Sequence, residues 1–300
     1  MKILTTPQEM RAWSRAQICN GASIGFVPTM GALHDGHLAL ARRAREENDV
    51  FAASVFVNPT QFGAGEDYAT YARPFQDDCE MLRQNGCDAL FAPSVAAMYP
   101  HLDTTSSTRS EVENTTRHHH EAQTVVEVQR LGEVWEGTVR PGHLRGVATV
   151  IAMLFNIVQP TRAYFGEKDY QQLKVVEHMA RDLCMGTEIV PCATVREPDG
   201  LALSSRNVNL SSDERRAASV LYRAMKSAVE AAQNGERDVT KLGEIMCGEM
   251  SQEPLSTVQY IAVVEAETLD LVSLLDGREA RILIAARVGR TRLIDNMMIR

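Results

Sequence analysis

The stretch FVPTMGALHDGHLALARRA, residues 26–44, begins like a buried strand and ends like a helix. Gly31 and Gly36 lie where one pattern gives way to the other, and His34 and His37 stand three residues apart at the same point. A strand followed at once by a helix predicts one crossover unit of an α/β sheet. We expect the helix to begin near Gly36 or His37.

The same alternation continues along the chain. Apolar runs at SIGFVPT, VFAASVFVNPT, DALFAPS, TVVEV, RAYFG and TEIVPCATV each predict a strand. Segments with helical period lie between most of them, at residues 6–20, 37–47, 73–85, 143–158 and 169–184. This order predicts an α/β fold, a Rossmann-like doubly wound parallel sheet, in which ligands bind beyond the carboxyl ends of the strands. The loops after FVPT, FVNPT and YFG should therefore carry the chemistry.

The pattern changes after Arg206. LSSDERRAASVLYRAMKSAVEAA opens with a serine N-cap and early acids and continues as an amphipathic helix. A second helix is expected at residues 239–251, followed by strand-like runs at VQYIAVVE and ARILIAARVG. We therefore predict a larger domain over residues 1–206 and a smaller α+β domain over residues 207–300.

Composition narrows the class of protein. The chain has 300 residues and a formal net charge of -8, and its basic stretches, such as ARRAREEN, are interleaved with acids. These features disfavour a nucleic-acid partner. No apolar run approaches the roughly 18–20 residues that span a bilayer, and the start MKILTTPQEMRAW lacks the pattern of a signal peptide. Six scattered cysteines without a CxxC pair favour reduced thiols. The cytoplasm is the expected location.

Residues 101–123, HLDTTSSTRSEVENTTRHHHEAQ, stand apart from the rest of the chain. They contain almost no large apolar side chain, so we expect a mobile excursion. The triplet at residues 118–120 suggests a metal site, but consecutive histidines rarely face one ion and no Cys or acid pattern completes a site. A solvated loop is the simpler interpretation.

The His-containing turn suits a phosphate ligand. The first turn of a helix has unpaired N–H groups and the positive end of the helix dipole, and Gly31 and Gly36 allow close approach to the backbone. At spacing i, i+3, His34 and His37 can lie on one side of that turn, where the dipole favours neutral imidazoles that still donate an N–H. The alternative is that both histidines only satisfy local carbonyl groups.

Two further stretches have residues suited to phosphate. AYFGEKDYQQL, residues 163–173, is a short strand, a Gly-bearing turn and a helix, with Lys168 in the turn and Asp169 and Gln172 after it. REPDGLALSSRN, residues 196–207, places two hydroxyls and a guanidinium in succession at Ser204, Ser205 and Arg206. A surface loop with ordinary charges is the alternative for the first stretch. The Ser-Ser-Arg tripeptide is weak evidence by itself, and its place at the predicted end of the first domain, where a ligand between domains could be clamped, strengthens it.

HxGH at a strand-to-helix junction resembles the signature of the nucleotidyltransferase superfamily, whose members direct attack on the α-phosphate of a nucleotide. Further motifs narrow the resemblance: PTMGALHDGH, FVNPTQFGAGEDYATY, RPGHLRGVATV, YFGEKDYQQL, LALSSRN and AARVGRTRLIDN. Together they resemble the pantothenate synthetase (pantoate–β-alanine ligase) family, over residues 5–296. The resemblance implies ATP-dependent condensation of pantoate with β-alanine through a pantoyl adenylate, with release of AMP and pyrophosphate, and a homodimer formed through the smaller domain.

The resemblance also implies roles for particular residues. His37 would be the catalytic donor with His34 beside it on the phosphates, and Lys168, Ser204, Ser205 and Arg206 would also be catalytic. Gln61 and Gln172 would bind pantoate, Gln61 also facing β-alanine. The acids Asp77 and Asp78 would be linked to Mg²⁺, with a solvated helix face as the alternative. The nucleotide would contact Met30, Gly31, Ala32, Leu33, His34, Asp35, Gly36, His37, Gly166, Glu167, Lys168, Asp169, Val195, Leu203, Ser204, Ser205 and Arg206.

Three departures from the family pattern qualify these expectations. Residues 101–123 are longer than usual, and EVWEG replaces a shorter, often Cys-containing stretch, so the behaviour of a lid is in doubt. Met81 occupies a position where some members have a polar residue near the metal, which weakens the assignment of Asp77 and Asp78.

Three other functions stay open at this point. One is a nucleotidyltransferase that leaves the nucleotide on its product, and another is a nucleotide-binding regulator without turnover. The third is a tRNA-linked ligase, which the acidic charge disfavours. Identification of the products and a His37→Ala variant separate these functions.

Overall fold

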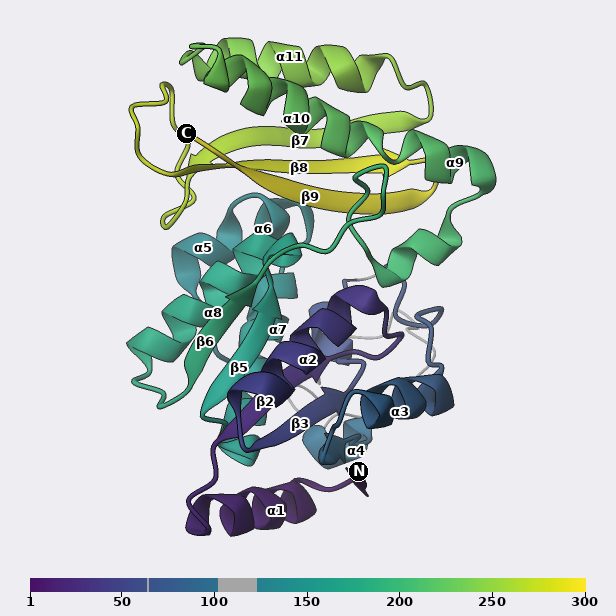
Figure 1. Cartoon of the computed structure of the whole chain (residues 1–300), viewed down its shortest axis with the longest axis vertical. Helices are drawn as coiled ribbons and strands as arrows, with labels where there is room; N and C mark the ends of the chain where they lie inside the picture. Colours follow the sequence, from purple (N-terminus) through teal and green to yellow (C-terminus); the bar gives the residue numbers. More distant parts are fainter. Residues whose placement is uncertain (64, 102–122) are drawn as a thin grey trace, which may run out of the picture. The chain divides into compact units, whose positions relative to one another are not determined.

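The computed structural model describes residues 1–63, 65–101 and 123–300 (Figure 1). The expected excursion at residues 101–123, including the histidine triplet, lies almost wholly outside the described residues. The chain divides into two compact units. The first comprises Met1–Leu33, His37–Phe165 and Val175–Pro191, and the second comprises His34–Gly36, Gly166–Lys174 and Cys192–Arg300. The domain boundary after Arg206 stays a prediction, because compact units need not fold separately.

The chain forms a six-stranded parallel sheet with the strand order β1-β4-β3-β2-β5-β6. Its strands are β1 (Lys2–Leu4), β2 (Ile24–Thr29), β3 (Val50–Val55), β4 (Ala89–Phe91), β5 (Arg162–Gly166) and β6 (Glu188–Cys192). Strand β2 pairs with both β3 and β5. Because it is covered on both faces, it is apolar at nearly every position rather than at alternate ones.

Helices connect these strands. They are α1 (Pro7–Cys19), α2 (Asp35–Glu47), α3 (Phe75–Gln84), α4 (Val95–Met98), α5 (Gln129–Glu133), α6 (Glu136–Val139), α7 (His143–Val158) and α8 (Tyr170–Asp182), with the 3-10 turns η1 (Pro59–Gln61) and η3 (Glu167–Asp169). The connection from β2 runs back to β3, whereas that from β5 runs onward to β6. Right-handed crossovers then put helices on both faces, which confirms the doubly wound α/β prediction. The winding reverses at the carboxyl ends of β2 and β5.

Local sequence explains where several helices begin and end. Thr6 caps α1 by accepting from the backbone N–H of Glu9, whose side chain accepts from Thr6 in return, and Pro7 occupies the first turn. The predicted bounds of α7 are the observed ones, because a long apolar run ends at Gln159, which adopts a left-handed conformation with φ of 51°.

One predicted strand of this region is wrong. TVVEV, residues 124–128, forms no strand. The backbone N–H of Val126 donates instead to Oγ1 of Thr149 on α7 at 3.0 Å, and the Val126 carbonyl accepts from the same hydroxyl at 3.3 Å. A side chain therefore satisfies the backbone groups that a neighbouring strand would have used.

The second unit contains a three-stranded antiparallel sheet in the order β7-β8-β9. Its elements are η4 (Ser205–Asn209), α9 (Ser212–Ala217), α10 (Val220–Gln233), α11 (Val239–Ser251), β7 (Ser256–Glu265), β8 (Ala280–Val288) and β9 (Thr291–Ile299). Helices α10 and α11 pack together and onto this sheet (Figure 1), burying Met225, Met246 and Ile284 among others. The long helix expected after Arg206 is divided into α9 and α10. The predicted helix at residues 239–251 and both predicted strands are present, which confirms an α+β arrangement.

Candidate active site

The loop after β2 has an unusual backbone. Gly31 and Ala32 both have positive φ, 84° and 52°. The Gly31 N–H donates to Oγ1 of Thr29 at 3.1 Å, and that hydroxyl donates to the Ser54 carbonyl at 2.7 Å. A Cβ on Gly31 would lie 2.8 Å from Oδ2 of Asp78. The turn therefore requires glycine, for its backbone conformation and for space.

Asp78 on α3 holds the same loop. The N–H of Ala32 donates to Asp78 Oδ2 at 3.0 Å, and the N–H of Leu33 donates to Oδ1 at 2.8 Å. Asp78 is completely buried. Burial raises the pKa of this carboxyl, and the hydrogen bonds from Leu33 and Ala32 oppose that increase. Because two N–H groups bind the two carboxylate oxygens, the loop has a fixed shape at the place where the sequence predicts bound phosphate.

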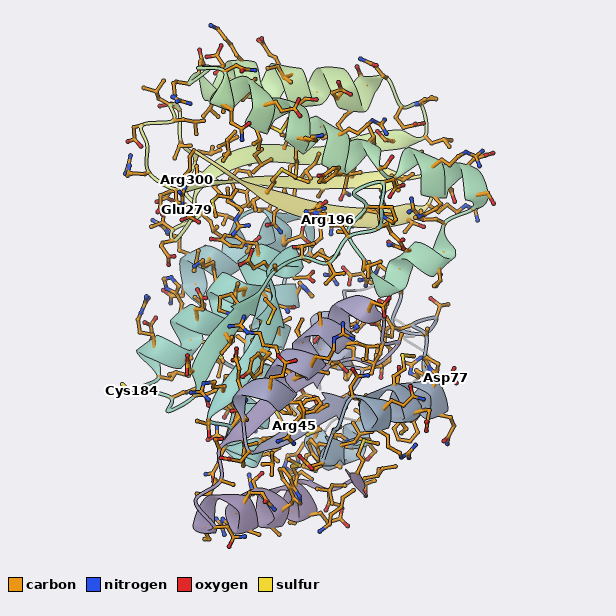
Figure 2. All side chains as sticks on the ribbon, viewed as in Figure 1. Arg45, Asp77, Cys184, Arg196, Glu279 and Arg300 are labelled. Carbon is orange, nitrogen blue, oxygen red and sulfur yellow. The ribbon has the colours of Figure 1, made fainter. Side chains whose placement is uncertain are left out.

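Asp77 and Asp78 do not form a ready pair of metal ligands. Asp77 is exposed on α3 (Figure 2), whereas Asp78 is buried with both oxygens accepting from the loop. Consecutive helical residues also point about 100° apart. Among the described residues, no group of three His, Cys, Asp or Glu side chains could hold a metal ion. The donor set therefore does not fit a shared Mg²⁺, and the metal assignment stays a prediction.

We expect Asp78→Asn to impair the predicted ligase activity and Asp77→Asn to leave it near wild type. The asparagine amide provides one acceptor where the loop needs two. The free energy of unfolding should therefore decrease by about 1.5–3 kcal/mol. Raising Mg²⁺ should not restore activity. Activity titrated against Mg²⁺, with urea unfolding of both variants, checks this. A parallel increase in the Mg²⁺ requirement of both variants would instead support a metal pair.

His34 lies in the second unit as a neutral imidazole. Its Nδ1 accepts from the Gly36 N–H at 3.2 Å, which leaves the proton on Nε2. Burial, and after it the positive charge of Lys168, lowers the pKa of His34 to about 4, although Asp169 and Asp35 act in the opposite direction. The expectation of a neutral N–H donor at this turn therefore has structural support.

The second unit also gathers other predicted nucleotide residues. Lys168 lies in η3 directly after β5, with its Nζ 3.9 Å from Oδ2 of Asp169. The Leu203 N–H donates to the Val195 carbonyl at 3.0 Å, and Ser204 caps η4 by accepting from the Arg206 N–H at 3.3 Å. The SSR stretch is thus the first turn of a helix with its hydroxyl cap in place, rather than an irregular loop.

Gln61, the predicted pantoate ligand, is buried in the first unit. Its Oε1 accepts from Asn58 Nδ2 at 3.1 Å, and its Nε2 donates to the Met30 sulfur at 3.0 Å. The structure thus brings Gln61 to the loop after β2. For Gln172, on α8, the assignment remains a sequence-based prediction.

A network that the sequence alone does not reveal fixes the backbone of Gln61. His143 Nδ1 lies 2.8 Å from the Gln61 carbonyl and its Nε2 lies 2.9 Å from Nη1 of Arg140, so Nδ1 donates and Nε2 accepts. Arg140 in turn pairs with Glu66 at 2.6 Å. Burial, and then Arg140, lowers the pKa of His143 to about 4. The RPGH motif quoted for the family resemblance contains this histidine, but local spacing does not show its partner.

Because of His34 and His143, we expect the stability of the protein to fall in acid. Both are neutral in the folded chain down to a pKa of about 4, whereas the ordinary value is 6.5. The unfolded chain therefore binds more protons between those values, and the free energy of unfolding should decrease as pH falls from about 6.5 to 4. In urea unfolding across this range, the free energy of unfolding of His143→Gln should depend less steeply on pH than that of the wild type. The difference in slope should correspond to at most one proton. An unchanged slope would contradict the assignment.

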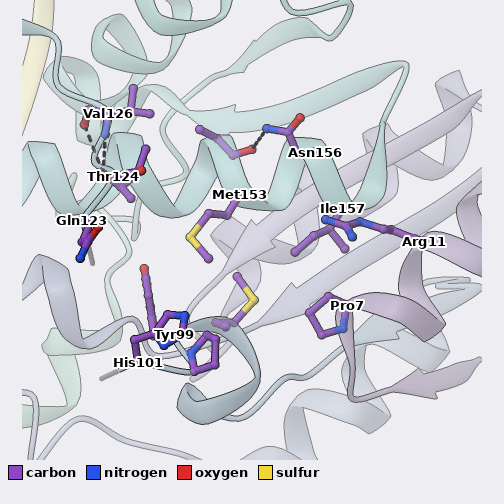
Figure 3. A pocket seen from close by; sticks show the side chains of 14 residues that line it. Pro7, Arg11, Tyr99, His101, Gln123, Thr124, Val126, Met153, Asn156 and Ile157 are labelled. Carbon is purple, nitrogen blue, oxygen red and sulfur yellow. Dashed lines mark hydrogen bonds between the residues drawn. The ribbon is translucent and has the colours of Figure 1, made fainter. Parts of the chain in front are cut away.

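A separate cavity of about 880 Å³ lies in the first unit (Figure 3). Tyr99, Met153 and Asn156 are among its lining residues, and His101 and Gln123 border it. No residue assigned above to nucleotide, pantoate or metal lines this cavity in the described part of the chain.

None of the helices in the described residues is long and apolar enough to cross a membrane.

The fold and the HxGH turn define the class of protein. The parallel sheet is doubly wound, and a histidine-containing turn joins β2 to α2 where the winding reverses. This is the arrangement of an HxGH nucleotide-binding α/β enzyme. Comparison with known proteins names the family. The family model of pantoate-beta-alanine ligase matches residues 2–298. The chain belongs to this family and is a ligase.

Individual relatives match this chain over nearly their whole length. The pantothenate synthetase of Rubrobacter xylanophilus is 55% identical over 98% of this chain and 97% of its own. A crystal structure of the pantothenate synthetase from Thermus thermophilus is 46% identical, with a TM-score of 0.86 and 99% of both chains covered. The ligase from Francisella tularensis, complexed with beta-gamma ATP and beta-alanine, is 34% identical with a TM-score of 0.77, covering 99% of this chain and 97% of that one.

Proposed function

We propose that the chain condenses pantoate with β-alanine, using ATP, through a pantoyl-adenylate intermediate. The observation that carries this proposal is the His34 turn just before α2, in which the Gly36 N–H donates to Nδ1 and the imidazole proton is on Nε2. The positive charge of Lys168 contributes to the lowered pKa of this histidine. The related ligase complexed with beta-gamma ATP and beta-alanine supports the two ligands. Pantoate follows from the family.

The proposed first step forms the adenylate. A carboxylate oxygen of pantoate attacks the α-phosphorus of ATP, and the bond from that phosphorus to the α,β-bridging oxygen breaks, so pyrophosphate leaves. Negative charge moves onto the leaving group. His37, the His34 Nε2–H, Lys168 and Arg206 would stabilise that charge. The helix N-terminus, with its N–H groups, would add to the same field.

The second step forms the amide. The neutral amine of β-alanine attacks the acyl carbon of the adenylate, the bond from that carbon to the AMP oxygen breaks, and the nitrogen loses a proton. Gln61 and Gln172 would hold pantoate, with Gln61 also facing β-alanine. Holding the intermediate beside the amine makes this step nearly unimolecular. No covalent enzyme intermediate is required.

The nucleotide would lie on the predicted backbone and side-chain contacts. Those are residues 30–37, 166–169, Val195 and 203–206, with Ser204 and Ser205 as hydroxyl donors. The loop at residues 31–33 already has its shape from Asp78, so little ordering is needed on binding.

Three further features belong to the proposal. Mg²⁺ is proposed as the metal that accompanies the triphosphate, whose charge it would screen.

A homodimer is proposed from the family resemblance, and the edge strands β7 and β9 carry the exposed apolar residues Val258 and Met298. Light scattering of the purified protein tests it. The cytoplasm is proposed because scattered unpaired cysteines suit a reducing compartment.

The decisive experiment separates the two steps. With ATP, Mg²⁺ and pantoate alone, labelled pyrophosphate should exchange into ATP, and AMP with pantothenate should form only when β-alanine is added. Formation of ADP, or no exchange without β-alanine, would overturn the adenylate. A stable adenylylated product would favour a nucleotidyltransferase, and binding of ATP with no turnover would favour a regulator.

A further inference from the structure

Asn296, in the IDN sequence of β9, contacts the turn that carries Lys168. It is 3% exposed, and its Nδ2 donates to the backbone carbonyls of both Glu167 and Lys168 at 2.8 Å. One side-chain amide has two N–H donors, and here both bind consecutive carbonyls. The turn is therefore held at two adjacent points from within the second unit.

The orientation of this amide is itself fixed. Nη1 of Arg281, on β8, donates to Asn296 Oδ1 at 3.1 Å, so the NH₂ group must face the carbonyls. Arg281 is 7% exposed, and its guanidinium lies 4.0 Å from the centre of the Tyr170 ring. Tyr170 begins α8, directly after the Lys168 turn, and its hydroxyl donates to the Ala266 carbonyl at 2.9 Å. Arg281 thus connects the amide to the helix that follows the turn.

A partly buried ion pair fixes the strand on which Asn296 lies. Arg196 donates to both oxygens of Asp295, at 2.6 and 2.9 Å, and to the Asn296 carbonyl at 3.2 Å. Asp295 is 4% exposed, and its Oδ1 also accepts from the Asn296 N–H at 2.8 Å. Bidentate pairs of this kind restrict geometry strongly. The backbone around Asn296 therefore has little freedom to move.

We propose that Asn296 is a positioning residue that places the Lys168 ammonium for the phosphates of ATP. The inference rests on the proposed function, in which Lys168 binds those phosphates. In the proposed mechanism Asn296 touches no reacting group. It acts through the backbone of residues 167–168. Without its two hydrogen bonds, Lys168 would sample more positions, and charge stabilisation that depends on position would weaken.

The test is a double-mutant cycle with pantoate-dependent pyrophosphate release. Asn296→Ala should lower kcat/KM for ATP about tenfold or more, and Lys168→Met should lower it further. In the Lys168→Met background, Asn296→Ala should then have almost no additional effect. Asn234→Ala, at an exposed asparagine of the same unit that follows α10, is the control and should match wild type.

The outcomes distinguish a failure of the proposed role of Lys168 from a failure of the positioning role of Asn296. If Lys168→Met has no effect, the proposed role of Lys168 fails. If Lys168→Met impairs the enzyme but the two effects multiply, Asn296 does not act through Lys168 and the inference is overturned. Should Asn296→Ala not fold, Asn296→Ser keeps one hydroxyl donor in place of the two N–H donors. It should give a smaller loss that also disappears in the Lys168→Met background, and a loss that persists there would overturn the inference.

Discussion

His37→Ala should leave a folded protein whose kcat is about 100- to 1,000-fold lower, the usual cost of removing one donor to a developing negative charge. His37 lies in the first turn of α2, where backbone N–H groups and the helix dipole already favour an anion. Its donation is needed most when charge builds on the leaving pyrophosphate, so ATP affinity should change much less than turnover. Single-turnover AMP formation and ATP binding by calorimetry measure the two quantities separately.

Two control variants make the His37 result specific. His178→Ala removes a histidine from α8 that has no assigned role, and it should retain activity. His37→Gln keeps a side-chain N–H donor and should recover part of the loss. A weaker ATP affinity with turnover reduced less than threefold would favour a nucleotide sensor over the ligase mechanism.

Local pattern predicted most of the elements. Strand β2 and helix α2 follow from an apolar run that ends in a Gly-bearing turn, and α7 follows from its apolar period and its end at Gln159. Strand β9 was missed because Asp295 and Asn296 are buried in the middle of it and interrupt the apolar pattern. Their burial depends on Arg196 and Arg281, which come from distant parts of the chain.

The supporting residues of the site could not be predicted from spacing. Asp78 binds a loop 46 residues away, His143 binds the carbonyl of a residue 82 positions away, and Asn296 binds a turn 129 positions away. Only the folded chain brings such residues together. By contrast, a neutral His34 was predicted from its place at the start of a helix, where the dipole opposes protonation. In the folded chain, burial and the distant Lys168 lower its pKa.

Gly146→Ala should disturb the site from outside it. Gly146 is buried in α7, and a Cβ there would lie 2.4 Å from the Thr60 carbonyl oxygen and 2.7 Å from Cα of Gln61. Backbone cannot move aside as a flexible side chain can, so η1 and α7 must separate. We expect a loss of about 1–3 kcal/mol in stability from the overpacking.

The same displacement should reach the chemistry. The Gly146 carbonyl accepts from Asn58 Nδ2, which also donates to Gln61 Oε1, so moving α7 moves the partner of the proposed pantoate ligand. A misplacement of about 1 Å can cost roughly 100-fold in rate. We therefore expect kcat/KM for pantoate to fall by at least tenfold, with a much smaller change for ATP.

Gly243→Ala is the matched control for Gly146→Ala. Gly243 is also inside a helix, α11, but a Cβ there meets nothing within 4 Å. The alanine should therefore raise stability by about 0.5–1 kcal/mol through helix propensity alone, with unchanged kinetics. Urea unfolding and pantoate kinetics of both variants decide the question. Equal behaviour of the two alanines would mean that the approach of η1 to Gly146 does not hold Gln61 in place.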